Sequence, residues 1–188
     1  SSTGKLLEPY GDLPESAAYE AFKGQATILV EGGVDGFIIE TMIDLKETVC
    51  TVKACKSVAP LPVIASLAFT TTKRGGRTTM GNSVKDCAVA LAEAGADVVG
   101  TNCGDLDPEQ MAEIVALFRE ATSLPIAAQP NAGKPKLVGD QTIFDLSPQD
   151  FATGIAKCVE AGARLVGGCC GTSPDHIRAV AELLRKEG

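Results

Sequence analysis

A short motif that occurs three times constrains the fold of this chain more than any other feature. Each copy closes an amphipathic helix and opens an apolar strand: Glu31-Gly32-Gly33-Val34-Asp35, Glu93-Ala94-Gly95-Ala96-Asp97 and Glu160-Ala161-Gly162-Ala163-Arg164. The glycine at the third position suits the left-handed conformation in which many helices end. Between the copies, two further strands open in a second style, at Leu61-Pro62-Val63 and Leu124-Pro125-Ile126. The repeat is therefore two strand–helix units long.

Strands and helices alternate along the chain. Short apolar runs predict five strands, at residues 36–40, 62–67, 97–101, 125–128 and 164–167. Six segments with helical spacing of apolar residues predict helices, and the first, from near Pro14, places Ala18, Phe22 and Leu29 on one apolar face. The other clear helix starts are Asp44, Asp107-Pro108, Ser147-Pro148 and Ser173-Pro174. Apolar strands between amphipathic helices are typical of a parallel sheet covered by helices.

This pattern places the chain in the α/β class. In a (β/α)₈ TIM barrel, alternate strands supply the same interior layer, which matches a repeat of two strand–helix units. Such a barrel takes about 250 residues, whereas this chain has 188. No linker or low-complexity tract divides the sequence, so we expect one domain over residues 1–188. The prediction is a partial barrel of about five parallel strands and six helices.

Composition excludes several classes of partner. The net charge is −7, aromatic residues make up 4% and tryptophan is absent. Nucleic acids and anionic membrane surfaces require a basic face, and single-stranded nucleic acid also requires aromatic stacking, so neither is expected as a partner. No apolar run approaches the roughly 20 residues that span a bilayer, and no signal peptide is visible. A soluble, cytoplasmic protein is expected.

The seven cysteines divide into two groups. An odd number in a chain that is not a small secreted scaffold favours reduced thiols over a disulfide framework. Four lie within predicted helices and are expected to act as small core residues: Cys50, Cys55, Cys87 and Cys158. The other three lie at glycine-rich strand ends: Cys103, Cys169 and Cys170.

The repeat places these three thiols at one height in the fold. Counting from the first glutamate of each copy, Glu40 lies nine residues on, Cys103 ten, and Cys169 and Cys170 nine and ten. That height is the carboxyl end of the strands, where barrel enzymes have their active sites. Three thiols with an open fourth position are a pattern for catalytic zinc. Adjacent residues of a regular strand point to opposite faces, so both Cys169 and Cys170 can serve only if the flanking glycines make the backbone irregular. Buried thiols or a redox pair are the alternatives.

Two glycine-rich runs resemble the zinc signatures of a known family. They are Val99-Gly100-Thr101-Asn102-Cys103-Gly104 and Gly167-Gly168-Cys169-Cys170-Gly171-Thr172. Supporting matches are Phe37-Ile38-Ile39-Glu40-Thr41 and Gln129-Pro130-Asn131-Ala132-Gly133. Along essentially the whole chain, the sequence resembles the homocysteine S-methyltransferase family, which includes the homocysteine-binding domain of cobalamin-dependent methionine synthase and betaine–homocysteine methyltransferase.

The resemblance implies a function and a set of site residues. Cys103, Cys169 and Cys170 match the zinc ligands; Glu40, Thr41 and Asn131 match substrate-binding positions, with Glu40 holding the amino group of homocysteine. The family transfers a methyl group to the homocysteine thiol and so forms methionine. The resemblance does not identify the donor, and any methylcobalamin would come from a corrinoid-bearing domain or protein elsewhere.

The resemblance also bears on organisation. By motif order, the five predicted strands match the fourth to eighth of the family barrel, so the chain is expected to lack the first three strand–helix units. Two unpaired sheet edges would favour a homo-oligomer or pairing with a chain that supplies the missing strands. The alternatives are a zinc-binding structural or assembly fragment without turnover, and a redox protein. His176 is expected on the surface of the last helix. Residues 70–77 are expected to form a long polar loop, either solvated or in contact with a cofactor-bearing partner.

Overall fold

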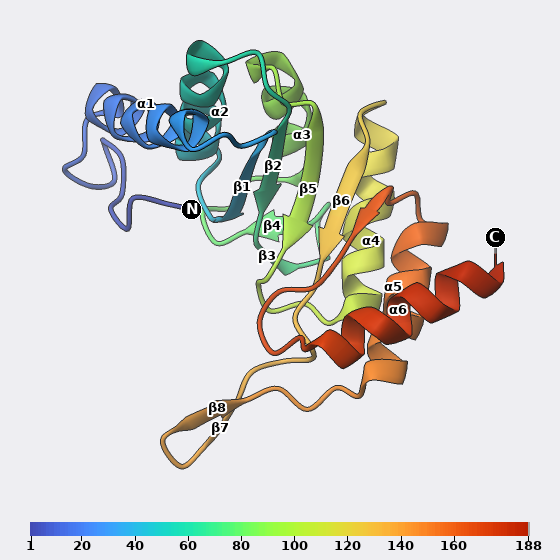
Figure 1. The fold of residues 1–188 in the computed structure, drawn as a ribbon. Coiled ribbons are helices and arrows are strands. Elements are labelled where there is room, and N and C mark those ends of the chain that lie inside the picture. Colours follow the sequence, from blue (N-terminus) through green and yellow to red (C-terminus); the bar gives the residue numbers. More distant parts are fainter. Residues whose placement is uncertain (188) are drawn as a thin grey trace.

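The computed structural model describes the backbone of residues 1–187 and the side chains of residues 1–185. At its centre is a five-stranded parallel sheet in the order β1-β2-β5-β6-β9 (Figure 1). The strands are β1 (Phe37–Met42), β2 (Val63–Leu67), β5 (Val98–Asn102), β6 (Ile126–Gln129) and β9 (Leu165–Val166). Each strand lies beside the next one along the chain, as in a barrel wall, and within the described residues β1 and β9 form the two edges.

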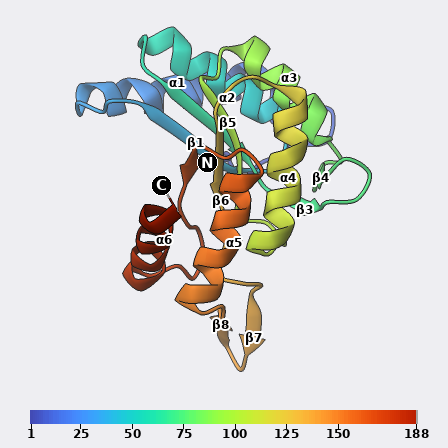
Figure 2. The ribbon, with the colours of Figure 1, turned by 90° about the vertical axis from the view of Figure 1, so that its right-hand side faces the viewer.

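Six helices connect and cover these strands. They are α1 (Glu15–Glu31), α2 (Leu45–Val58), α3 (Val84–Ala94), α4 (Pro108–Ala121), α5 (Pro148–Glu160) and α6 (Pro174–Glu187). Helices α2 to α5 contact the strands, α1 packs on α2, and α6 packs on α5 (Figure 2). None of the helices in the described residues combines the length with the apolar character that a bilayer crossing requires.

The two faces of the sheet differ in burial. Phe37 and Ile39 of β1 lie in the main hydrophobic core, 5% and 3% exposed, together with apolar residues of the covering helices. Side chains alternate along a strand, so Ile38 faces the opposite side, and it is 48% exposed. Leu165 of β9 is also 39% exposed. The sheet is therefore covered by helices on its outer face and open on its inner face, as expected for part of a barrel.

The predicted five-stranded parallel sheet and six helices are confirmed. The repeated glycines close their helices as predicted, because Gly33, Gly95 and Gly162 have positive φ angles of 83°, 95° and 116°. One detail of the first helix was wrong. Leu29 is 43% exposed and Ala26 is buried in its place, because α1 packs mainly on α2 and buries only a narrow stripe with a spacing of four residues.

Two short antiparallel hairpins were not predicted. Strands β3 (Phe69–Thr71) and β4 (Arg77–Thr78) form one of them, where residues 70–77 were expected to form a polar loop. Strands β7 (Lys136–Val138) and β8 (Gln141–Ile143) form the other, which projects from the carboxyl end of the sheet (Figure 1). All six strand residues of β7 and β8 are exposed. Neither hairpin has the alternating apolar pattern by which a half-buried strand is recognised.

Removal of the α3 cap gives a stability prediction. The Ser83 hydroxyl accepts a hydrogen bond from the Asp86 backbone N–H at 3.1 Å, and the Asp86 carboxylate accepts one from the Ser83 N–H at 3.3 Å. Loss of such a cap costs about 1 kcal/mol, so Ser83→Ala should lower the urea midpoint at an unchanged m-value, whereas Ser83→Thr should retain most of the stability. Equal midpoints for the alanine variant and the parent would contradict this.

The cap also gives a pH dependence. The hydrogen bond from Ser83 lowers the pKa of Asp86 from its ordinary value of 3.8. The ionised carboxylate therefore favours the fold, and its contribution is present above pH 3.8 and is lost as the pH falls through the lower pKa of the folded state. The difference in stability between the parent and Ser83→Ala should shrink over that range.

Candidate metal centre

Three cysteine sulfurs meet at the carboxyl end of the sheet. Cys103 directly follows β5, and Cys169 and Cys170 follow β9. The Sγ atoms of Cys103 and Cys170 are 3.9 Å apart, those of Cys169 and Cys170 are also 3.9 Å apart, and all three lie within 4.8 Å of one another. Sequence analysis predicted this convergence from the repeat, on condition that the flanking glycines make the backbone irregular, and the structure brings the three side chains together.

These distances fit a metal ion and not a disulfide. A disulfide requires an S–S distance of about 2.05 Å, and all three cysteines are free. Tetrahedral zinc, with Zn–S bonds of about 2.3 Å, holds neighbouring sulfurs about 3.8 Å apart. The two shortest separations therefore nearly equal the edge of such a tetrahedron, and three thiols leave its fourth corner open. Softness of the donors favours zinc over magnesium or calcium.

The electrostatics of the cluster also favour a cation. Burial, followed by the proximity of Cys103, raises the pKa of Cys169 to about 12. The same two causes raise the pKa of Cys170. Three thiolates at these separations would repel one another strongly. A divalent cation removes this penalty, because metal coordination deprotonates a thiol.

The backbone around the cysteines is irregular, as the adjacent pair requires. Strand β9 ends at Val166, so Cys169 and Cys170 lie in a turn and not on a strand, and both sulfurs reach the same point. Cys103 has a φ of 54° and Gly104 a φ of 73°, which together turn the chain away from β5. A Cβ on Gly104 would lie 2.4 Å from the Phe69 carbonyl oxygen, so only glycine fits there.

Asn131 connects the two cysteine loops. Its side chain is buried, with 3% exposed, and its Nδ2 donates to the Gly104 carbonyl at 3.1 Å. Its Oδ1 accepts from the Cys170 backbone N–H at 3.0 Å. The structure thus assigns Asn131 a structural role that sequence analysis did not predict, namely holding the loops of Cys103 and Cys170 together. The expected contact with substrate stays a prediction.

Glu40 and Thr41 lie at the end of β1. Glu40 is two residues beyond Ile38, so alternation places it on the same open inner face of the sheet. It is partly exposed, and among the described residues its carboxylate takes part in no hydrogen bond or ion pair. Thr41 has a φ of 58°, which is rare for a β-branched residue. Its backbone N–H donates to Asn102 Oδ1 at 2.8 Å.

Sequence analysis gave no role to Asn102 and Gln129, which neighbour the site. They are paired in register on β5 and β6. Asn102 is fully buried, and its Nδ2 lies 3.7 Å from Cys169 Sγ. Gln129 has a buried Oε1 with no hydrogen-bond partner among the described residues. Both residues could have been recognised in the sequence as polar side chains at the end of an apolar strand.

The remaining cysteines and His176 serve the interior. Cys50, Cys55, Cys87 and Cys158 are buried, as predicted. The expectation of a surface histidine was wrong: His176 is 8% exposed, and its Nε2 lies 2.9 Å from the Leu146 carbonyl oxygen. Its Nδ1 interacts with Ser173, and its ring stacks edge-on against Phe151. The first turn of a helix is usually exposed, which is why a surface position was expected. Here α6 packs on α5, and the imidazole ring is buried.

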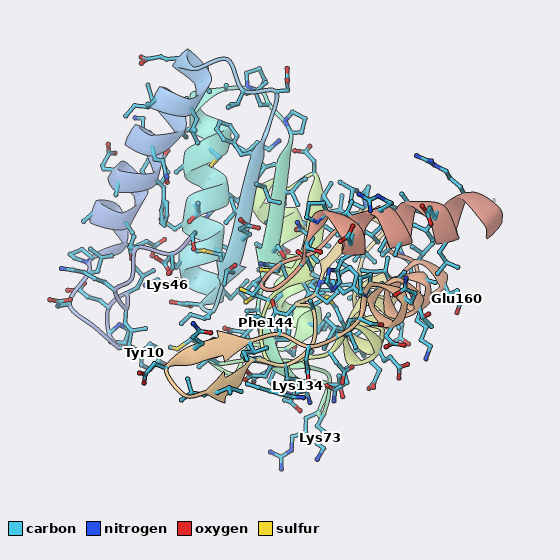
Figure 3. The ribbon with its side chains drawn as sticks, turned by 60° about the horizontal axis from the view of Figure 1, so that its bottom comes forward. Tyr10, Lys46, Lys73, Lys134, Phe144 and Glu160 are labelled. Carbon is cyan, nitrogen blue, oxygen red and sulfur yellow. The ribbon has the colours of Figure 1, made fainter. Side chains whose placement is uncertain are left out.

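The surroundings of the thiols are open on one side. Cys170 is exposed, whereas Cys103 and Cys169 are half-buried. Phe144, at the base of the β7–β8 hairpin, lies so close to Gly171 that a Cβ there would be 2.3 Å from its side chain. Figure 3 looks onto this end of the molecule and labels Phe144 and Lys134. The base of this hairpin therefore packs against the loop that carries Cys169 and Cys170.

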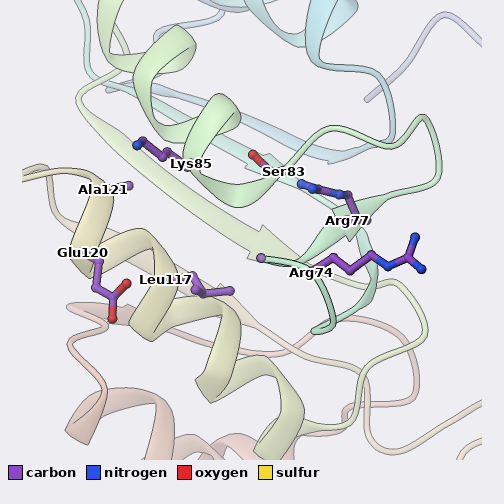
Figure 4. A pocket seen from close by; sticks show the side chains of 8 residues that line it. Arg74, Arg77, Ser83, Lys85, Leu117, Glu120 and Ala121 are labelled. Carbon is purple, nitrogen blue, oxygen red and sulfur yellow. The ribbon is translucent and has the colours of Figure 1, made fainter.

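A hollow lies away from the three clustered cysteines. A cavity of about 420 Å³ is lined by residues of the β3–β4 loop, the start of α3 and the end of α4, among them Arg74, Arg77, Lys85 and Glu120 (Figure 4). None of the three clustered cysteines lines it. The candidate metal centre is therefore recognised by the chemistry of its side chains and not by this cavity.

Comparison with known proteins agrees with the geometry. The family model for homocysteine S-methyltransferase matches residues 1–184. The methionine synthase of Mycobacterium leprae (strain TN) is 30% identical over 184 residues, which cover 95% of this chain and 15% of that protein. The methionine synthase of Mycobacterium tuberculosis (strain ATCC 25618 / H37Rv) gives the same figures. The chain thus spans about 15% of the length of these curated relatives.

Solved structures support the same fold. The homocysteine methyltransferase MmuM from Escherichia coli, in its apo form, superimposes with a TM-score of 0.72 at 22% identity, over 93% of this chain and 60% of that one. Its metallated form gives a TM-score of 0.66 at 24% identity, over 87% of this chain and 52% of that one. At these identities the likeness concerns the fold, and it is the family model that covers nearly the whole sequence. The chain belongs to the homocysteine S-methyltransferase family.

Proposed function

We propose that this chain carries the zinc- and homocysteine-binding part of a methyltransferase that methylates the thiol of homocysteine and forms methionine. The observation that carries the proposal is the spacing of the three sulfurs. Two Sγ–Sγ distances of 3.9 Å fit three corners of a zinc tetrahedron, and the fourth corner is left for a substrate sulfur. Membership of the family supports the same reaction.

The proposed zinc ligands are Cys103, Cys169 and Cys170. Bound there, zinc would supply a Lewis-acid centre that keeps the homocysteine sulfur in its thiolate form at neutral pH. The chain's own contribution is to hold three thiolates on two loops, with Asn131 connecting them. Three anionic ligands donate strongly to the metal, so the substrate sulfur keeps much of its nucleophilicity.

The proposed binding site for the amino-acid end of homocysteine is the end of β1. The carboxylate of Glu40 would accept a charge-assisted hydrogen bond from the substrate ammonium group. It has no partner of its own in the described residues, so no existing interaction has to be broken. Thr41 and Asn131 are proposed to complete this pocket.

The methyl donor is proposed to arrive from elsewhere. The curated relatives are much longer than this chain, which leaves room for other domains in the intact proteins. A corrinoid-bearing domain or protein that supplies methylcobalamin would be one such donor. The first three strand–helix units of the barrel are also proposed to come from other sequence or another chain, in a cytoplasmic assembly.

A second function is favoured by one observation. The inner face of the sheet exposes Ile38 and Leu165, and the edges at β1 and β9 have one neighbour each within the described residues. Such a sheet invites association with further strands. The chain could thus bind zinc and serve assembly without turning over substrate on its own.

One experiment separates the two functions. The purified chain is loaded with zinc, its metal content is measured, and it is incubated with homocysteine and either methylcobalamin or S-methylmethionine. Methionine formation, followed by mass spectrometry, would show a self-sufficient enzyme. One zinc per chain that binds no homocysteine would favour the assembly function, whereas binding of zinc and homocysteine without methionine would support a methyltransferase part that needs its missing strands for turnover. Absence of bound zinc would contradict both.

A further inference from the structure

We infer that Asn102 is a positioning residue that fixes Cys169 and the end of β1 relative to each other. This inference rests on the proposed function, because it concerns how the metal ligand and the amine-binding strand end are held. Asn102 is the last residue of β5 and lies between β2 and β6 in the sheet. Its side chain is fully buried.

The amide of Asn102 has its full set of partners. Oδ1 accepts hydrogen bonds from the Thr41 backbone N–H at 2.8 Å and from the Ser66 hydroxyl at 2.9 Å. Nδ2 donates to Thr41 Oγ1 at 2.8 Å and to Cys169 Sγ at 3.7 Å. A side-chain amide offers two donors and two acceptor lone pairs, so none is left over. Turning the amide over would set its NH₂ group against the Thr41 N–H, donor against donor, so a single orientation is stable.

Two of these bonds hold a strained backbone. Thr41 has a φ of 58°, a conformation that is strained for a β-branched residue. Such a conformation persists only where the surroundings over-determine it. Asn102 hydrogen-bonds both to the backbone N–H and to the hydroxyl of Thr41. The course of the chain immediately after Glu40, and with it the direction of the Glu40 carboxylate, therefore depends on Asn102.

The fourth bond reaches the sulfur cluster. The side-chain Nδ2 of Asn102, at the end of β5, donates to Cys169 Sγ at 3.7 Å. Groups that hydrogen-bond to a metal ligand orient it, and their removal typically costs about 10- to 100-fold in metal affinity. One amide thus couples the position of Cys169 Sγ to that of the Glu40 carboxylate. A substrate that binds both the metal and Glu40 must therefore match a fixed distance between them.

The test uses the full chain and cobalt(II), whose thiolate-to-metal absorption reports both affinity and coordination geometry. Asn102→Ala should weaken cobalt binding by about tenfold or more and shift the absorption bands. It should also abolish the preference of the cobalt-loaded protein for homocysteine over 4-mercaptobutyrate, which lacks only the amino group. Asn102→Ser, whose single hydroxyl cannot reach Thr41 and Cys169 together, should behave similarly and provides a second variant should alanine prevent folding.

Ser66→Ala is the matched control. Ser66 is equally buried and contacts the same Oδ1, but neither Thr41 nor Cys169 in the hydrogen bonds described. It should lower thermal stability while leaving cobalt affinity within about twofold and the spectrum unchanged. Folded Asn102 variants with the parent's cobalt affinity, spectrum and ligand preference would overturn the inference and leave the proposed function intact. Failure of the parent chain to bind cobalt would overturn both.

Discussion

Replacing Cys103 with serine is expected to reduce the zinc content of the purified chain from one ion to less than about 0.1 per molecule. A serine hydroxyl stays protonated at neutral pH and is a poor ligand for zinc. Only two of the three proposed protein ligands, Cys169 and Cys170, then remain. Any homocysteine methylation in an assembly containing this chain should fall to the uncatalysed background. The measurements are metal analysis after gel filtration and methionine formation.

The chain provides its own control for this prediction. Cys87 is fully buried in the main core and lies outside the sulfur cluster. Burial, followed by the charge of Asp86, raises its pKa to about 12, so it remains a neutral thiol. Cys87→Ala should lower stability by about 1 kcal/mol and leave the zinc content unchanged. If Cys103→Ser retains one zinc per chain, or if Cys87→Ala loses it, the assignment of ligands is wrong.

The sheet and the convergence of the cysteines could be predicted because they follow from local rules. Gly95 is an example: it was predicted to end α3 in the left-handed conformation, and its φ of 95° confirms this. Once each helix end is located, the distance from it to the carboxyl end of the next strand is fixed by strand length. Counting nine or ten residues from the repeat therefore located Cys103 and Cys170 correctly, although they are 67 residues apart.

Tertiary contacts decided what could not be predicted. The turn that brings Cys169 and Cys170 to one point depends on β9 ending at Val166, three residues earlier than the cysteine pair. A continuous strand would have separated the two sulfurs. The network of Asn102 joins residues 61 and 67 positions apart, so no local pattern reveals it. The burial of His176 likewise depends on the docking of α6 against α5.

Glu40 is the second residue on which the proposed function depends. It lies two residues after the inner-face residue Ile38, and Asn102 hydrogen-bonds both to the next residue, Thr41, and to Cys169. The carboxylate lies on the open inner face and takes part in none of the five ion pairs of the described residues. A cationic group of a ligand would pair with it. The carboxylate would thus select an amino acid thiol over a simple thiol.

Glu40→Gln is expected to weaken the binding of homocysteine to the metal-loaded chain by about 1.5–3 kcal/mol, or roughly 10- to 150-fold in Kd. Glutamine keeps the shape of the side chain and loses the charge that pairs with the ammonium group. Titration of the cobalt-loaded protein, followed by its thiolate absorption, measures this. The same variant should bind 4-mercaptobutyrate as the parent does, because that ligand has no amino group, and Glu31→Gln, at the exposed end of α1, should change neither affinity. Equal losses for both ligands would mean that Glu40 supports the metal site and not the amine, whereas an unchanged affinity for homocysteine would remove Glu40 from the binding site altogether.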